Sequence, residues 1–344
     1  MIKTFNKRAL DSEFLGDLLD GPLTQILERV KKDDTLCLEL RGSFIDIYYR
    51  GETLYFIQAL GNHQYRISYN ENYNKEKEID TKSATLIEIP TVEKAVEDVS
   101  IHKQTMDYYF ANHQKLEREF QQLILRENNN SGKVTDSTDY YILDIEYAFN
   151  GNNESGDEIS ARYDMLAVRW ASEGSVRKKT QNLPISFIEV KYGDGAMGSG
   201  ADVSTSGIHK HINDYINFRK DSSMLSALAE DMAEVFNQKH KLGLISSYQN
   251  REEELTISLN SNDVEFLFVL ANHDPAKGKL LEEIDEAIKE WNGKPEEMYL
   301  DEIRVAVSSL IGYGLYAYDK NGENRYLTIR EFYDSCNPTN RTAM

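Results

Sequence analysis

The stretch that decides the fold is Ile185-Ser186-Phe187-Ile188-Glu189-Val190-Lys191, an apolar run that closes on an acid and a lysine. Side chains two residues apart in a strand share a face, so Glu189 and Lys191 would point the same way as Phe187. A buried charge without a partner costs several kcal/mol, so an acid inside an apolar strand needs a cation or a metal beside it. The run therefore predicts a core strand with polar chemistry at its end.

An earlier apolar run, Tyr163-Asp164-Met165-Leu166-Ala167-Val168, also contains one acid. If the two runs form neighbouring strands, Asp164 meets Glu189 and Lys191 at one point of the sheet. Carboxylate oxygens are the ligands that hard divalent cations prefer. The two runs together therefore predict a divalent-metal site.

Working outward, hydrophobic periodicity and turn residues predict an α/β chain of the α+β type in two regions. Residues 1–100 are expected to form an N-terminal helix and an antiparallel meander of three to five strands, and residues 101–344 a second domain. The expected helices are 1–30 with a break at Gly21-Pro22, 105–126, 208–218, 223–238 and 280–291, and the expected strands are 140–149, 159–170, 183–192, 264–270 and a last pair within 303–318.

Composition narrows the class of protein. The 344 residues carry a formal charge of −19 and only two cysteines, Cys37 and Cys336, which excludes a disulfide framework and a CxxC metal site. No apolar run approaches the roughly 18–20 residues of a membrane span, and no signal-peptide pattern opens the chain. We therefore expect a cytoplasmic protein without a membrane partner.

The charge is unevenly distributed along the chain. Residues 281–302 contain nine acids and two lysines, whereas residues 161–220 contain nine Lys or Arg and six acids. The strand-rich centre is thus locally basic, including Arg177-Lys178-Lys179 and His209-Lys210-His211. A simple nucleic-acid-coating protein would be basic overall, so the acidic chain argues against that class. An enzyme with metal-binding acids is compatible with the pattern.

The order helix, three strands, helix, strand, with Asp164 on the second strand and Glu189-x-Lys191 on the third, resembles the PD-(D/E)XK nuclease superfamily. The resemblance covers about residues 105–275 and implies a restriction-endonuclease-like mixed sheet flanked by helices. Tyr163 stands where the proline that names the motif would be. The resemblance implies metal-dependent hydrolysis of phosphodiester bonds, and a role in restriction, phage defence or repair would follow from the family alone.

The same resemblance implies roles for individual residues. Asp164, Glu189 and the Val190 carbonyl would hold Mg²⁺ or Mn²⁺, and Lys191 would orient the attacking water or stabilise the transition state. Many superfamily members also carry a glutamate on the helix before the first strand. Either Glu117 or Glu119 could be this glutamate, and Glu117 is preferred. It would bind a second metal ion or a water molecule on the first metal ion.

Superfamily members often carry Gln-x-x-x-Tyr on the helix after the third strand, and this chain has His211-Ile212-Asn213-Asp214-Tyr215 there. His211 and Tyr215 are expected to contact the DNA backbone or to brace the site, and Lys210 is assigned to substrate binding with them. DNA is the expected substrate ahead of RNA, which stays open. Cutting both strands with one site per chain would favour a homodimer.

Two alternatives stay open. A catalytically inactive PD-(D/E)XK-like binding or assembly module would also explain the acidic composition and the altered glutamine position. The run Gly193-Asp194-Gly195-Ala196-Met197-Gly198 matches a dinucleotide-binding pattern, but the following helix is expected to begin only near Gly207, too late for that fold. Asp144 and Glu146, on the first strand of the second domain, are expected to face solvent.

Overall fold

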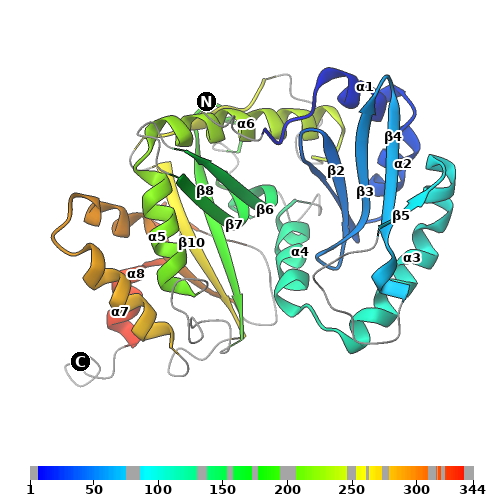
Figure 1. Cartoon of the computed structure of the whole chain (residues 1–344). Helices are drawn as coiled ribbons and strands as arrows, with labels where there is room; N and C mark the ends of the chain where they lie inside the picture. Colours follow the sequence, from blue (N-terminus) through cyan, green and yellow to red (C-terminus); the bar gives the residue numbers. More distant parts are fainter. Residues whose placement is uncertain are drawn as a thin grey trace. The chain divides into compact units, whose positions relative to one another are not determined.

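The computed structural model describes residues 7–74, 86–129, 138–152, 158–172, 177–193, 207–245, 253–260, 263–272, 279–308, 315, 317–318 and 322–336. The chain forms two compact units (Figure 1). The large unit comprises Met1–Asn6, Lys133–Ala233 and Glu253–Met344, and the N-terminal unit comprises Lys7–Gly132 and Glu234–Glu252. The compact units therefore divide near residue 132, whereas the sequence suggested a boundary at residue 100.

The N-terminal unit is built on a five-stranded antiparallel sheet in the order of the chain. Its strands are β1 (Leu36–Leu40), β2 (Phe44–Tyr49), β3 (Glu52–Gly61), β4 (Gln64–Asn70) and β5 (Leu86–Ile89). Each strand pairs with the one before it, which confirms the predicted meander. The β2–β3 turn uses positive φ at Arg50 and Gly51, and a Cβ at Gly51 would lie 2.1 Å from the Arg118 carbonyl oxygen. Glycine is required there.

Among the described residues, the helices α1 (Ser12–Asp20), α2 (Thr24–Lys31), α3 (Val92–Asn112) and α4 (Leu116–Asn129) lie wholly within the N-terminal unit. The prediction of one helix over 105–126 was wrong, because α3 ends at Asn112 and α4 begins at Leu116. The first half of α3 was missed because its buried stripe is thin, with Ala95 and Val99 among polar neighbours. The Thr91 side chain caps α3 by accepting from the Lys94 amide.

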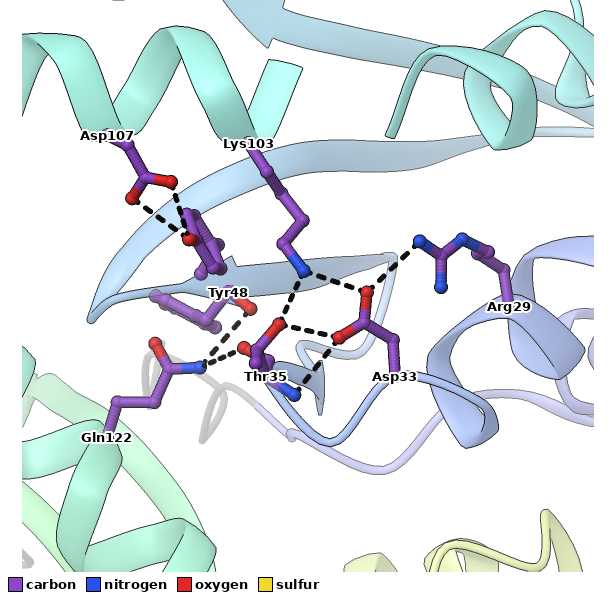
Figure 2. A network of polar contacts seen from close by, with 8 residues as sticks. Arg29, Asp33, Thr35, Tyr48, Lys103, Asp107 and Gln122 are labelled. Carbon is purple, nitrogen blue, oxygen red and sulfur yellow. Dashed lines mark hydrogen bonds and ion pairs between the residues drawn. The ribbon is translucent and has the colours of Figure 1, made fainter. Parts of the chain in front are cut away.

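A polar network joins these helices to the start of the sheet (Figure 2). From α3, the Lys103 Nζ donates to Asp33 Oδ2 at 2.8 Å and to Thr35 Oγ1 at 2.6 Å. The Arg29 guanidinium of α2 lies 3.1 Å from the same Asp33 oxygen. From α4, Gln122 Nε2 donates to the Thr35 carbonyl at 2.9 Å. Three helices are thereby tied to the segment that leads into β1.

The large unit contains a seven-stranded mixed sheet. Six strands run in the order β12 (Leu327–Thr328), β11 (Ile303–Ser308), β10 (Val264–Ala271), β8 (Leu183–Tyr192), β7 (Glu158–Arg169) and β6 (Tyr140–Asn152), and β9 (Ile257–Ser258) pairs with β8. The strands β6, β7 and β8 form an antiparallel meander, and β8, β10 and β11 are parallel. The mixed sheet and its helices confirm the α+β class.

Helices connect the parallel strands. Between β8 and β10 the chain forms α5 (Ile208–Arg219) and α6 (Ser222–Lys241), and α7 (Leu280–Trp291) with the 3₁₀ helix η5 (Pro295–Glu302) precedes β11. In Figure 1, α5 lies across the sheet, where it packs against β7 and α7. The last helix is α8 (Ile329–Cys336). Of the predicted pair within 303–318, the first strand is confirmed as β11, which pairs with β10 and β12, and most of the second lies outside the described residues.

A buried acid links four strands at the centre of this sheet. Glu265 of β10 accepts from Tyr140 Oη at 2.8 Å and from Ser186 Oγ at 2.9 Å, and Arg169 Nη1 lies 3.4 Å away. The surrounding core is apolar, with the β10 run buried throughout. Among the described residues, no helix combines the length and apolar content needed to cross a membrane.

Candidate functional site

The strands β7 and β8 bring two predicted site acids together. Their antiparallel register runs from Val168 opposite Ile185 to Met165 opposite Ile188, so the next step of the register places Asp164 opposite Glu189. At that step the Asp164 Oδ2 accepts a hydrogen bond from the Val190 amide at 2.7 Å. The two runs are therefore neighbouring strands, as predicted, and their acids meet at the end of the pairing.

Glu189 is buried between Lys191 and His211. Its Oε1 lies 2.5 Å from Lys191 Nζ and 2.9 Å from His211 Nε2, which reaches it from α5. Only 2% of Glu189 is exposed. Burial favours the neutral acid, but the charges and hydrogen bonds of His211 and Lys191 outweigh it and hold the pKa of Glu189 below its ordinary value. The buried carboxylate is therefore charged near neutral pH.

These side chains line one pocket of about 290 Å³, and its acidic and basic lining residues are Glu146, Arg162, Asp164, Glu189, Lys191 and His211. The lining comes from β6, β7, β8 and α5. Four of the residues were predicted from the sequence. The pocket thus gathers three carboxylates and two permanent cations around an open volume.

Glu146 is one of two charged lining residues that the sequence did not reveal, and Arg162 is the other. On β6 and β7, Ile145 lies opposite Met165 and Tyr147 opposite Tyr163, which places Glu146 opposite Asp164. Its φ of 53° is unusual for a residue with a side chain. Glu146 lines the pocket, so three acids follow one another across β6, β7 and β8. The expectation that it only faces solvent was wrong.

Asp144 was also expected to face solvent, and this expectation was wrong because only 1% of Asp144 is exposed. The β6–β7 register shifts between Ile142 and Asp144. A shift of one residue exchanges the two faces of a strand, so alternation counted along the sequence assigns the wrong face beyond it. This irregularity depends on the partner strand and leaves no mark in the sequence of β6.

Tyr215 braces the fold and does not face a ligand. It is fully buried, its ring stacks on Phe266 with centroids 4.8 Å apart, and its hydroxyl donates to Glu302 at 2.5 Å. Burial raises the pKa of Tyr215 well above its usual value, with Glu302 adding to the effect. The expectation of a backbone contact with DNA was therefore wrong for Tyr215, and the bracing role that it was also given fits.

Two other predicted residues are not part of the pocket lining. Lys210 forms an ion pair with Asp214, one turn further along α5. Glu117 lies on α4, in the N-terminal unit, and stays a prediction as a metal ligand. Its alternative, Glu119, is held by Arg50, whose Nε lies 3.0 Å from the Glu119 carboxylate. The Val190 carbonyl also stays a prediction, although its amide is bound to Asp164.

Several basic residues of the two basic runs and of α5 make structural contacts. His209 Nε2 lies 2.6 Å from Glu290 of α7, and Arg219 Nε lies 2.8 Å from Glu302 of η5. Arg177 is buried, and its guanidinium lies 4.7 Å from the centre of the Trp170 ring. Two acids of segment 281–302, Glu290 and Glu302, therefore pair with α5, whereas Lys178 and Lys179 of the first basic run are exposed.

One other cluster offers metal-ligand atoms. In the part of the chain that the structure describes, only Glu13, Asp17 and His63 form a group of three or more such side chains with ligand atoms within 4.8 Å of one another. Asp17 there already accepts from Tyr65 Oη at 2.6 Å and contacts His63 Nδ1 at 2.9 Å. These contacts account for the cluster as part of the N-terminal fold.

The glycine run after β8 lies mostly outside the described residues, beyond Gly193, and α5 begins directly after Gly207 as predicted. No protein-family model, no curated protein and no solved structure matches this chain.

Proposed function

We propose that this protein is a metal-dependent nuclease of the PD-(D/E)XK type that hydrolyses phosphodiester bonds, with DNA as substrate ahead of RNA. The observation that carries the proposal is the meeting of Asp164, Glu189 and Lys191 at one end of the β7–β8 pair, where they line a common pocket. The meander β6–β7–β8, followed by α5 and the parallel strand β10, supports the proposal through the order of its elements.

The oxygen donors of the pocket are of the type that Mg²⁺ and Mn²⁺ prefer, although their ligand atoms do not form a group of three within 4.8 Å of one another. Magnesium is commonly bound through one or two carboxylates, with waters and phosphate oxygens completing its coordination. Asp164 and Glu189 offer such oxygens, and Glu146 supplies a further acid on the adjacent strand. A bound ion would lower the pKa of a coordinated water and neutralise charge on the scissile phosphate.

The protein's own residues would prepare the site for that chemistry. The hydrogen bond from the Val190 amide fixes the direction of the Asp164 carboxylate. Glu189 holds the Lys191 ammonium at the pocket wall, where low exposure strengthens its attraction for a developing negative charge. Arg162 is an exposed guanidinium at the same pocket, suited to bidentate contact with a phosphate. His211 positions Glu189 from the helix side.

A second candidate function has one observation in its favour. Glu189 Oε1 already contacts both Lys191 and His211, and a closed ion cluster of this kind can be purely structural. The protein would then be a catalytically inactive binding or assembly module. Metal titration separates the two candidates, because an inactive module has no reason to bind Mn²⁺ through Asp164.

The test is cleavage of supercoiled plasmid, linear duplex, single-stranded DNA and RNA in Mg²⁺ or Mn²⁺, with Lys191→Ala as the inactive variant. Lys289→Ala is the matched control, since Lys289 is an exposed lysine of α7 that pairs with Asp285 and lies outside the pocket lining. We expect metal-dependent cleavage by the wild type and by the control, and none by Lys191→Ala. Equal cleavage by all three proteins would show a contaminating nuclease.

Metal binding is measured separately by Mn²⁺ titration of the wild type and of Asp164→Ala. Binding that is lost in Asp164→Ala supports the nuclease, whereas absence of both binding and cleavage favours the inactive module. Sedimentation of the active protein, with and without a duplex substrate, tests the proposed homodimer.

A further inference from the structure

A second pocket lies in the N-terminal unit, between α3 and the short 3₁₀ helix η1 (Glu71–Asn74), and it contributes nothing to the proposed hydrolysis. Its volume is about 580 Å³, and its lining consists of three tyrosines, a histidine, two asparagines, a glutamine and a threonine. No lysine, arginine, aspartate or glutamate occurs in this lining within the described residues. The pocket is therefore aromatic and hydrogen-bonding, and it carries little charge.

The spacing along α3 explains how one helix supplies most of this lining. Gln104, Tyr108 and Asn112 follow one another at intervals of four, and Tyr109 and His113 form the adjacent row. Residues four apart lie on the same side of a helix. Tyr108 is 79% exposed, more than any other large apolar or aromatic side chain in the described part of the chain. An aromatic ring is thus held at the surface beside amide groups.

The wall behind Tyr108 is held in place by other rings. His113 stacks on Tyr109 with centroids 4.3 Å apart and an interplanar angle of 11°. Tyr73 of η1 meets Tyr109 edge-on at 5.3 Å and is itself buried. These contacts set the position of the pocket wall without using Tyr108. The pocket therefore has a packed aromatic base and one exposed ring.

We propose that this pocket binds the planar ring of a nucleobase, carried either by a free nucleoside or by an unpaired strand. The base would stack on Tyr108, and its polar edge would meet the amides of Asn112 and Gln104. Base–aromatic stacking is the usual means of holding unpaired bases. Amide side chains offer both a donor and an acceptor to a base edge.

The chemistry of the lining favours a base over the other ligands that such a pocket could hold. A phosphate group alone would need lysine or arginine, and the described lining contains neither. A sugar ring is puckered and offers less flat surface to Tyr108 than a base does. The proposal does not rest on the nuclease activity, because it concerns binding in a different unit.

Binding is measured with the full chain carrying Lys191→Ala, in EDTA, so that cleavage cannot interfere. The ligands are adenosine, cytidine, a short labelled single-stranded DNA, an abasic strand of the same length and a linear oligosaccharide. Tyr108→Ala, Asn112→Ala and Tyr108→Trp alter the pocket. Ile101→Ala on the same helix, with Ile101 at 53% exposure, is the surface control.

We expect base-containing ligands to bind about 5- to 150-fold more weakly to Tyr108→Ala, the range that loss of one stacking contact gives. Tyr108→Trp and Ile101→Ala should bind like the parent protein, and Asn112→Ala should bind several-fold more weakly. If adenosine or cytidine binds, the pocket can take a free nucleoside. If only the single-stranded DNA binds, the ligand is a base within an unpaired strand.

Three results would overturn the proposal: no binding of any base-containing ligand, equal affinity in the parent protein and Tyr108→Ala, or preference for the abasic strand or the oligosaccharide. Tyr108 is exposed, so folding of Tyr108→Ala is not at risk, and circular dichroism verifies it. A protein without nuclease activity could still pass this test, and an active nuclease could fail it, so the two proposals are separable.

Discussion

The molecule contains two acid–lysine pairs that resemble each other in distance and differ in their surroundings. In the large unit, Lys191 Nζ lies 2.5 Å from Glu189 Oε1, and in the N-terminal unit, Lys103 Nζ lies 2.8 Å from Asp33 Oδ2. Both pairs are shielded from solvent to a large extent. By distance alone, either one could be taken for a catalytic pair.

The surroundings distinguish them. Asp33 also bonds to Arg29 and Thr35, and Lys103 lies 4.8 Å from the centre of the Tyr49 ring (Figure 2). The Asp33 pair therefore joins α2 and α3 to the start of the sheet. The Glu189 pair comes from a single strand and lines a pocket beside Asp164 and Glu146. Additional acids and open volume, more than the ion pair itself, mark a site for chemistry.

The largest expected effect tests the comparison directly. Lys191→Ala should reduce cleavage by about 10²- to 10³-fold, the loss that follows removal of one group that stabilises developing charge. Lys103→Ala should leave cleavage unchanged, because Lys103 does not line the pocket. Rates are measured on the preferred nucleic acid under metal saturation. Equal losses in both variants would remove the distinction between the two pairs.

The next effect concerns stability. Lys103→Ala should lower the free energy of unfolding of the protein by about 2 kcal/mol, because it removes two hydrogen bonds and a cation–π contact from a shielded acid. Denaturant titration measures the loss. Lys94→Ala is the matched control on α3, since Lys94 forms only an exposed pair with Asp98 and should not matter. A loss as large in the control would contradict the role given to Lys103.

The contribution of the Asp33–Lys103 pair to the stability of the protein should depend on pH. Burial opposes the charge of Asp33, but the bonds from Lys103 and Thr35 outweigh burial and lower its pKa from 3.8 to about 2. Its folded-state pKa lies below the unfolded value, so its contribution is complete above about pH 4 and disappears as the pH falls toward 2.

We expect this contribution to be about 1–2 kcal/mol, smaller than the full shift implies, because solvent reaches the pair in part. The measurement is the difference in unfolding free energy between wild type and Asp33→Asn at several acidic pH values. The difference should shrink steadily through this window. A difference that stays constant down to pH 2 would show that Asp33 keeps an ordinary pKa.

The smallest effect tests the bracing role of Tyr215. Tyr215→Phe removes the hydrogen bond from Tyr215 to Glu302. Glu302 still accepts from Arg219 Nε at 2.8 Å, so we expect the free energy of unfolding to fall by only about 1 kcal/mol. KM and kcat for cleavage should not change. A rise in KM without a loss of stability would instead place the Tyr215 hydroxyl in contact with substrate.

Local patterns were sufficient for most of the fold. The apolar runs around Phe187 and Phe266 are strands because they are short, rich in strand formers and bounded by turn residues. The spacing of Ile212 and Ile216 predicts the buried side of α5. Asp164, Glu189 and Lys191 could be singled out because charges inside apolar runs are rare. Each of these inferences uses only residues close together in the chain.

The errors about the candidate site have one origin, which is that the deciding contact comes from a residue far away in the sequence. Glu146 joins the pocket through its pairing with β7, after a register shift that β6 alone does not show. Glu302 takes the Tyr215 hydroxyl although 87 residues separate them. His209 and Arg219 of α5 pair with Glu290 and Glu302, which lie more than 80 residues further along the chain.

By itself, the sequence determined the α+β class, the strands that carry the acids and their meeting at one point. Tertiary structure alone decided that Glu146 completes the row of acids, that Tyr215 is a brace and that α3 and α4 belong with the N-terminal sheet. The physical reason is that periodicity and turn chemistry are local properties of the backbone. Register, burial and charge pairing depend on which distant segments pack together.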